Sequence, residues 1–128
     1  DIPGASQVFL GGVVSYTNHV KEQVLRVPAA LLDRCGAVSA PVARAMALGV
    51  RVLTGADLAV SVTGLAGPGG DDRGNPVGTV FAALAAPEGV FVRQLLLGGD
   101  RERIRTLSAH HALDMARRYL THQMTEGE

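Results

Sequence analysis

The 128-residue chain lacks several features on which large classes of proteins depend. Aromatic residues make up only 4% of it and tryptophan is absent, so we expect no base-stacking surface of the kind that binds single-stranded nucleic acid. Twelve basic and twelve acidic residues cancel, and a neutral chain offers no electrostatic attraction to nucleic acid or to an anionic membrane. One cysteine excludes an internal disulfide and fits a reducing compartment. We therefore expect a cytoplasmic protein with no nucleic-acid and no membrane partner.

The length of the chain and its high glycine content indicate how it is organised. A chain of 128 residues corresponds to one domain, or to one domain of a larger chain, with a real hydrophobic core. Glycine occurs 16 times in 128 residues, which is 12.5%, well above the average usage of about 7%. The glycines gather at the ends of apolar segments, which is typical of turns and not of a low-complexity sequence.

Hydrophobic periodicity and turn residues predict alternating strands and helices. The expected strands cover residues 8–17, 57–63, 78–86 and 89–97, the last two as a hairpin, and the expected helices begin near Asn18, Pro28, Ser39 and Asp100. This order implies both parallel and antiparallel neighbours, so it predicts an α/β fold, a three-layer α/β/α sandwich with a mixed β-sheet.

Two burial patterns are predicted from the same periodicity. In the helix over residues 39–55, an apolar stripe falls on one side and is expected to face the sheet. Residues 57–63 are almost continuously apolar, which predicts a strand buried on both faces. The stripe consists of Val42, Met46, Val50 and Leu53.

The most unusual segment is the glycine-rich loop at residues 64–70, "GLAGPGG", directly after the expected strand 57–63. Open α/β sheets place ligands at the carboxyl ends of their strands. The loop is not a dinucleotide-binding motif, because it leads into another strand and not into a helix, and it lacks the Gly-Lys-Ser/Thr ending of a P-loop. Its N–H groups could form an anion-binding nest, and a wide turn is an equally good interpretation.

Lys21 is the second candidate. If Asn18 caps a short helix, Lys21 lies at the third helical position, where the helix dipole is positive and lowers a lysine pKa. Burial would lower the pKa further. A lysine with a lowered pKa can act as a general base. The alternative is an ordinary surface lysine.

Other polar clusters favour structural interpretations. His110 and His111 are adjacent on a helix, so they point in different directions and cannot bind one metal together. Asp71, Asp72 and Asn75 could hold a cation, but their spacing matches no calcium loop and a polar turn is favoured. We therefore expect neither a metal nor a cofactor.

Three arginines crowd the start of the last helix, at Arg101, Arg103 and Arg105. Most charges in such a position form a solvated face. One of them could reach a bound phosphate from the start of the helix.

Taken together, five segments resemble consecutive blocks of one family, the C-terminal domain of CinA, a bacterial nicotinamide mononucleotide deamidase family. The blocks are "GGVVSYTNHVKEQVLRV", "CGAVSAPVARAMALGV", "LAVSVTGLAGPGG", "NPVGTVFAAL" and "GGDRERIR". They occur in the family's order and spacing over most of the chain.

The resemblance implies hydrolysis of the carboxamide of nicotinamide mononucleotide to nicotinic acid mononucleotide and ammonia, by a serine–lysine mechanism without a cofactor. Lys21 matches the family's lysine, and Thr63 matches the Ser/Thr that opens the glycine loop, so both are expected catalytic residues. The substrate-binding residues that the resemblance implies are Tyr16, Asn18, Gly64, Gly67, Gly69 and Arg105. The glycine loop would hold either the phosphate or the oxyanion.

One block of the family pattern is absent. The nucleophilic serine lies in an "E-S-x-T-G-G" block, and residues 1–128 contain no such block. We expect residues 1–128 to be a CinA C-terminal domain without its first strand and helix, and the alternative is a catalytically silent nucleotide-binding module that regulates a partner domain. Family resemblance also implies a homo-oligomer, and an upstream CinA N-terminal domain is left open.

Overall fold

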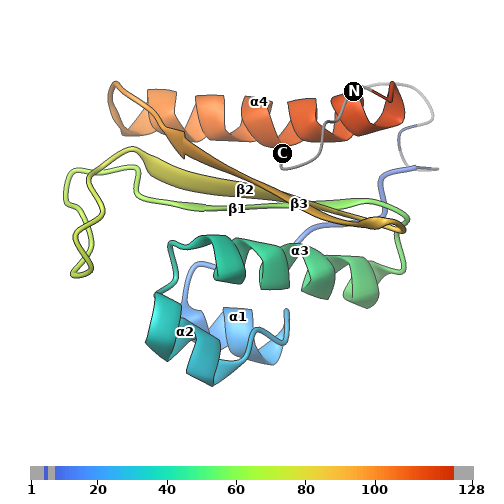
Figure 1. The fold of residues 1–128 in the computed structure, drawn as a ribbon, viewed down its shortest axis with the longest axis horizontal. Helices are drawn as coiled ribbons and strands as arrows, with labels where there is room; N and C mark the ends of the chain where they lie inside the picture. Colours follow the sequence, from blue (N-terminus) through green and yellow to red (C-terminus); the bar gives the residue numbers. More distant parts are fainter. Residues whose placement is uncertain (1–4, 6–7, 123–128) are drawn as a thin grey trace.

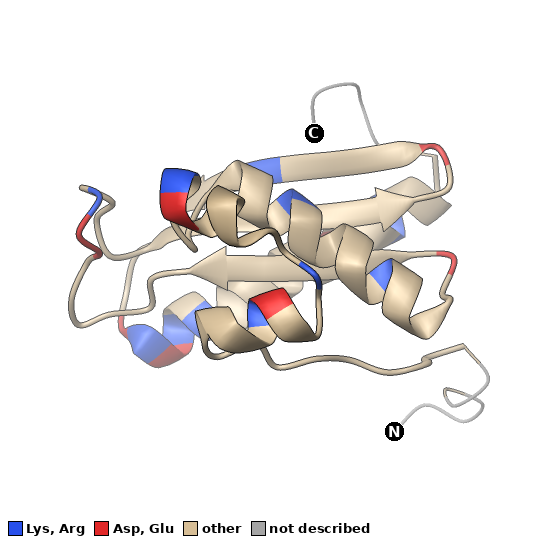
Figure 2. Cartoon of the chain, turned by 90° about the horizontal axis from the view of Figure 1, so that it is seen from below, with Lys and Arg blue, Asp and Glu red and all other residues tan. Residues whose placement is uncertain are grey.

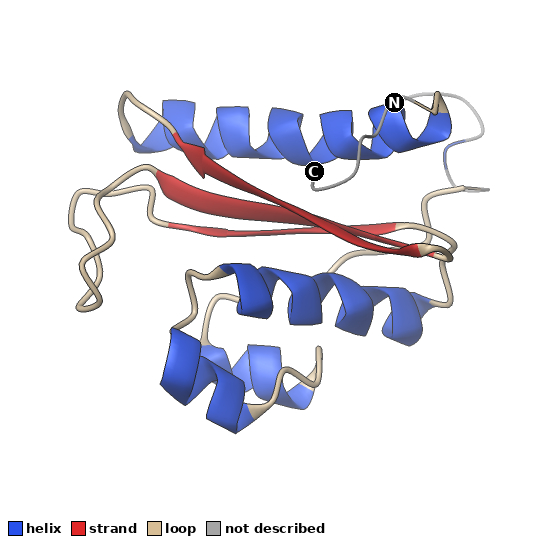
Figure 3. Ribbon diagram, in the orientation of Figure 1, coloured by secondary structure: helices blue, strands red, loops and turns tan. Residues whose placement is uncertain are grey.

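The computed structural model describes Ala5 and residues 8–122. Helices cover both faces of a single sheet, as Figure 1 and Figure 3 show: α4 covers one face, and α3 covers the other with α1 and α2 beyond it. The α/β class and the three-layer arrangement are therefore confirmed. The elements are α1 (Asn18–Gln23), α2 (Ala29–Cys35), α3 (Ala40–Thr54), β1 (Ala59–Gly64), β2 (Thr79–Ala86), β3 (Gly89–Leu96) and α4 (Arg101–Leu120).

The sheet has the order β1-β2-β3 in the described part of the chain. Both pairings are antiparallel, with Val62 opposite Ala82 and Ala82 opposite Arg93. β2 and β3 form the expected hairpin. The parallel neighbour that a mixed sheet requires is not found among these three strands, because the expected strand over residues 8–17 does not join them.

Residues 9–16 have no regular secondary structure, so the prediction of a strand there is wrong. The segment is apolar and β-branched, and yet Phe9 is 70% exposed and Val14 is 89% exposed. A β-prone sequence forms a strand only where another strand supplies hydrogen-bond partners. Residues 13–16 are instead separated from the edge strand β1 by a cavity that both of them line.

Helix α3 begins and ends where the sequence predicts. The Ser39 hydroxyl accepts a hydrogen bond from the Val42 N–H, and Gly55 ends the helix in a left-handed conformation (φ 71°). Its apolar stripe faces a different neighbour from the one expected. Val42 and Met46 pack against the α1–α2 region, whereas Ala43 and Ala47 contact the sheet, where their small side chains let the helix approach closely.

Strand β1 is less buried than expected. Its residues alternate between buried and more accessible positions, and Val62 is 36% exposed. The alternation arises because successive side chains point to opposite faces of the sheet: Ser61 faces α3, where its hydroxyl donates to the Ala43 carbonyl, whereas Val60 on the α4 side is only partly buried. Buried Ala112 and Met115 of α4 pack on Ala82 and Leu84 of β2, the central strand.

Candidate active site

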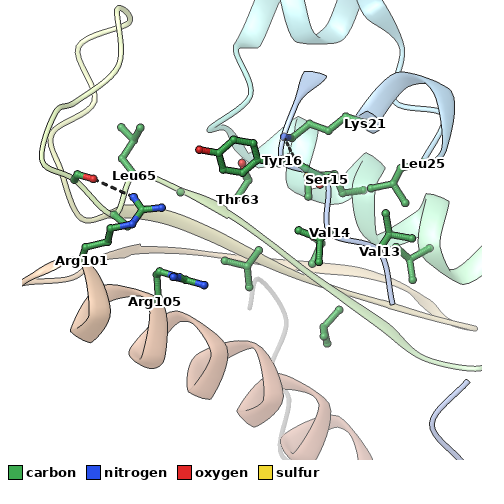
Figure 4. Close-up of a pocket in the computed structure, with 18 of the residues that line it drawn as sticks. Val13, Val14, Ser15, Tyr16, Lys21, Leu25, Thr63, Leu65, Arg101 and Arg105 are labelled. Atoms are coloured by element: carbon green, nitrogen blue, oxygen red, sulfur yellow. Dashed lines mark hydrogen bonds between the residues drawn. The ribbon is translucent and has the colours of Figure 1, made fainter. Parts of the chain in front are cut away.

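A cavity of about 620 Å³ lies beside β1, within the size range of small-molecule sites. Its walls come from segments far apart in the sequence: the extended residues 13–16, α1, α3, β1, the loop after β1, and the start of α4. Figure 4 shows two ends of this cavity. We call Ser15, Tyr16 and Lys21 the lysine end, and Gly67, Arg101 and Arg105 the arginine end.

The structure brings together most of the residues that the sequence marks as candidates. The residues that line the cavity include Tyr16, Lys21, Thr63, Gly64, Gly67, Gly69 and Arg105. Asn18 is not among them, since it lies in the exposed first turn of α1. The cap of α1 is Thr17, whose hydroxyl accepts from the Val20 N–H at 3.3 Å, so the prediction that Asn18 caps this helix is wrong.

Lys21 is the only lysine in the chain, and it is buried, with 7% of its surface exposed. Its ammonium group donates a 2.8 Å hydrogen bond to the main-chain carbonyl of Ser15. Burial lowers the pKa of Lys21, because removal from water penalises the charged form. The direction and the effect of burial agree with the prediction. The expected contribution of the helix start is wrong, because Lys21 lies in the last turn of α1.

The position of Lys21 depends on how α1 and its following turn pack against α3. Leu25 is 2% exposed and belongs to the same hydrophobic cluster as Met46. Gly49 of α3 allows this contact, because a Cβ atom there would lie 2.1 Å from the Leu25 carbonyl oxygen. A glycine in the middle of a helix is explained here by close backbone approach.

Thr63 is buried at the end of β1, and its hydroxyl donates a 2.7 Å hydrogen bond to the carbonyl of Ala37. That bond uses the only proton of the hydroxyl, so the oxygen remains as an acceptor. Toward a ligand in the cavity, Thr63 can therefore receive an N–H, such as that of a carboxamide, but cannot donate to an oxyanion.

The loop after β1 supplies free donors. Its first residue is tied to the sheet, because the Leu65 N–H donates to Thr79 and its carbonyl accepts from Gly78. Within the described residues, the N–H groups of Ala66, Gly67 and Gly69 have no hydrogen-bond partner. Gly67 has a φ of 97°, a conformation that favours glycine. Unpaired N–H groups in a cavity wall support the anion-nest interpretation over the simple turn.

The outer part of the same loop is a structured turn. Asp71 accepts hydrogen bonds from the N–H groups of Arg73 and Asn75 and from the Asn75 side chain, and the last of these is the main reason why its pKa is lowered. The Arg73 guanidinium donates to the carbonyls of Asp33 and Arg34 at the end of α2. The acidic residues of this loop therefore organise a turn, as the sequence favoured. No group of three or more metal-ligating side chains occurs in the part of the chain that is described.

Arg101 lines the cavity together with Arg105, and its guanidinium donates to the Gly67 carbonyl at 3.0 Å. The resemblance singled out Arg105 alone. A usable signal was present, since residues four apart share a helix face and Arg103 points elsewhere. Ser15 is close to Lys21 in the sequence, but the group that contacts Lys21 is its main-chain carbonyl, which a pattern of side chains does not reveal.

The cavity is electrostatically one-sided. Lys21, Arg101 and Arg105 line it, and among the described residues no aspartate or glutamate does. Elsewhere acidic and basic residues are interspersed, as Figure 2 shows for one face. A site with cationic walls in an otherwise neutral chain fits an anionic ligand. None of the described helices has the length and apolar character needed to cross a bilayer.

The fold and the cavity define a class: an α/β domain with a cavity at a sheet edge, lined by a buried lysine, a glycine loop and two arginines. The family model described as "CinA C-terminal domain" matches residues 1–120. The chain belongs to the CinA C-terminal domain family.

Relatives agree with this assignment. The chain is 53% identical over 120 residues to a "CinA-like protein" from Desulfotalea psychrophila and to a "putative competence-damage inducible protein" from Caldanaerobacter subterraneus subsp. tengcongensis. Each alignment covers 94% of this chain and 29% of the relative, so the chain spans under a third of their length.

Solved structures show the same fold. A competence/damage inducible protein, CihA, from Agrobacterium tumefaciens superposes with a TM-score of 0.85 at 40% identity, over 90% of this chain and 71% of the other. The competence damage-inducible protein A from Klebsiella pneumoniae gives a TM-score of 0.84 at 34% identity, over 88% of this chain and 70% of the other.

Proposed function

We propose that the protein hydrolyses the carboxamide of nicotinamide mononucleotide, releasing ammonia and nicotinic acid mononucleotide. The observation that carries the proposal is a buried lysine with a lowered pKa at one end of a cavity whose other end holds two arginines. The substrate has matching ends, a neutral carboxamide and an anionic phosphate. The identity of the substrate rests on the family resemblance set out from the sequence blocks.

The reaction follows serine–lysine chemistry. The neutral amine of Lys21 accepts the serine proton while the serine oxygen bonds to the carboxamide carbon. The C–N bond then breaks, the leaving nitrogen takes the proton from Lys21, and water hydrolyses the acyl-enzyme. Thr63 suits the carboxamide N–H₂ as an acceptor, and free N–H groups of the glycine loop suit an anion.

The serine in this proposal belongs to the E-S-x-T-G-G block implied by the resemblance, which residues 1–128 do not contain. Ser61 and Thr63 do not replace it, because each hydroxyl is committed to a backbone carbonyl, of Ala43 and Ala37. Ser15 reaches Lys21 through its carbonyl oxygen. These contacts also favour the second candidate function, a silent module that binds a mononucleotide and regulates a partner domain.

The experiment that separates the two functions uses the full-length protein and nicotinamide mononucleotide. Stoichiometric release of ammonia and nicotinic acid mononucleotide is the expected result. Binding measured by calorimetry without any product would contradict the amidase and support the silent module.

Self-association and a cytoplasmic location remain predictions. Large apolar side chains exposed in this chain, among them Phe9, Val14 and Val52, are the kind of surface that a second copy could cover. Analytical ultracentrifugation of the full-length protein tests this, and a monomer at high concentration would contradict it.

A further inference from the structure

Arg101 makes the contact that joins the glycine loop to α4. Its Nη1 donates to the carbonyl oxygen of Gly67 at 3.0 Å, across 34 positions of sequence. Figure 4 shows this bond at the mouth of the loop, with the Arg105 side chain on the next turn of the helix directed toward the cavity. Arg101 therefore belongs to the cavity wall and to the support of the loop at once.

The loop depends on few other ties at this point. Leu65 is held by the sheet, and the turn from Asp71 to Asn75 is held by its own hydrogen bonds and by Arg73. Between these anchors, residues 66–69 have the Arg101–Gly67 bond as their only hydrogen bond within the described part of the chain. The loop is therefore fixed against α4 by one side chain.

Arg101 has donors to spare. A guanidinium carries five N–H groups in a planar fork that matches a phosphate, and Gly67 takes one of them. In the part of the chain that the structure describes, the N–H groups of Ala66, Gly67 and Gly69 have no hydrogen-bond partner, and no carboxylate lines the cavity. Each of these features favours an anion with several oxygens at the arginine end.

We propose that Arg101 is a positioning residue, which holds residues 66–69 against α4 so that the free loop N–H groups and Arg105 bind a phosphate monoester. This inference rests on the proposed function and assigns the phosphate to the arginine end, which leaves the carboxamide at the lysine end. Loss of the Gly67 contact releases the loop and weakens binding of the phosphate while the lysine end is unchanged.

The test compares Arg101→Gln, Arg101→Lys and the control Arg103→Gln in the full-length protein. Arg103 is on the same helix but does not line the cavity. Calorimetry measures Kd for nicotinamide mononucleotide and for nicotinamide riboside, which lacks the phosphate. We expect Arg101→Gln to raise Kd for the mononucleotide about 10- to 100-fold, the size of a lost charge-assisted contact, and to change Kd for the riboside less than about threefold.

The lysine variant separates positioning from charge. Because a lysine side chain ends one bond short of the Arg101 Nη1 that reaches the Gly67 carbonyl, Arg101→Lys should keep most of the affinity defect. NMR order parameters of the Ala66, Gly67 and Gly69 N–H groups should be lower than wild type in both Arg101 variants and unchanged in Arg103→Gln. Full recovery of affinity by lysine, or unchanged order parameters, would overturn the positioning role.

Failure of this inference is distinguishable from failure of the proposed function. If the wild-type protein binds the mononucleotide and releases no ammonia, the amidase is wrong and the Kd comparison still decides the role of Arg101. Equal losses for mononucleotide and riboside would overturn the phosphate assignment. So would a wild-type protein that binds neither the mononucleotide nor inorganic phosphate.

Discussion

The two ends of the cavity both carry basic side chains, but these side chains are buried at one end and exposed at the other. At the lysine end, one amine is buried against a main-chain carbonyl, and burial lowers its pKa. At the arginine end, Arg101 and Arg105 project from exposed positions of α4, and a guanidinium stays charged at any ordinary pH. Similar formal charges thus serve different purposes: a proton acceptor needs desolvation, whereas an anion site needs permanent charge.

The largest effect is expected when the amine of Lys21 is removed. Lys21→Met keeps an unbranched apolar side chain in the buried site but has no proton acceptor. We expect kcat for ammonia release to fall by about 10³-fold or more, while Kd for the mononucleotide changes little. Steady-state kinetics and calorimetry measure the two quantities. Arg44→Gln, at an exposed position of α3, is the control, and near-normal turnover by Lys21→Met would rule out the lysine mechanism.

The pH dependence follows from the lowered pKa of Lys21. The neutral amine is the active form, so kcat/KM should rise up to about tenfold per pH unit below that pKa and level off above it. The same shift affects stability. Because the unfolded lysine binds its proton more tightly than the folded one, the free energy of unfolding should rise with pH between the lowered pKa and the ordinary value.

Two measurements check these signs: the pH–rate profile, and denaturant unfolding of wild type and Lys21→Met at several pH values. The rise in unfolding free energy should be smaller in Lys21→Met. A Lys21 that titrates at the ordinary lysine pKa in an NMR experiment would contradict the prediction.

Packing of the lysine end can be disturbed without touching the arginines. Gly49→Ala places a Cβ atom 2.1 Å from the Leu25 carbonyl oxygen, so α1 must move away from α3. We expect a loss of about 1–3 kcal/mol in unfolding free energy and a lower kcat. Gly98→Ala is the matched control, because nothing lies within 4 Å of a Cβ atom there. Equal melting temperatures for the two variants would contradict this account.

The smallest expected effect is at Thr63, between the two ends. Thr63 and Thr79 are both buried, and each hydroxyl donates to a backbone carbonyl at 2.7 Å, but only Thr63 lines the cavity. Replacement of either by valine should cost about 1–2 kcal/mol of stability. Only Thr63→Val should also lower kcat/KM, by about tenfold. An equal loss of activity in Thr79→Val would show that Thr63 has only a structural role.

Much of the candidate site was predictable from the sequence. Family blocks pointed to Lys21, Thr63, the glycine loop and Arg105, all of which line one cavity. The predicted N-cap of α1 was one residue off, because Thr17 and not Asn18 caps this helix. Arg101 was grouped with Arg103 and Arg105 but not singled out. Its spacing from Arg105 places both on one helix face, whereas its contact with Gly67 joins segments 34 positions apart and is seen only in the structure.

Local physics set most element boundaries in this chain. The Ser39 hydroxyl and the Asp100 carboxylate each cap a helix by accepting a hydrogen bond from an N–H three residues later, and Gly55 ends α3. These contacts are local in sequence, so the helix ends can be predicted without knowledge of the fold. Tertiary structure alone decided that residues 9–16 stay out of the sheet, that the α3 stripe faces α1 and α2, and that Lys21 is buried. Burial and strand pairing depend on which distant parts of the chain come close together in space. The local sequence of a segment does not contain that information.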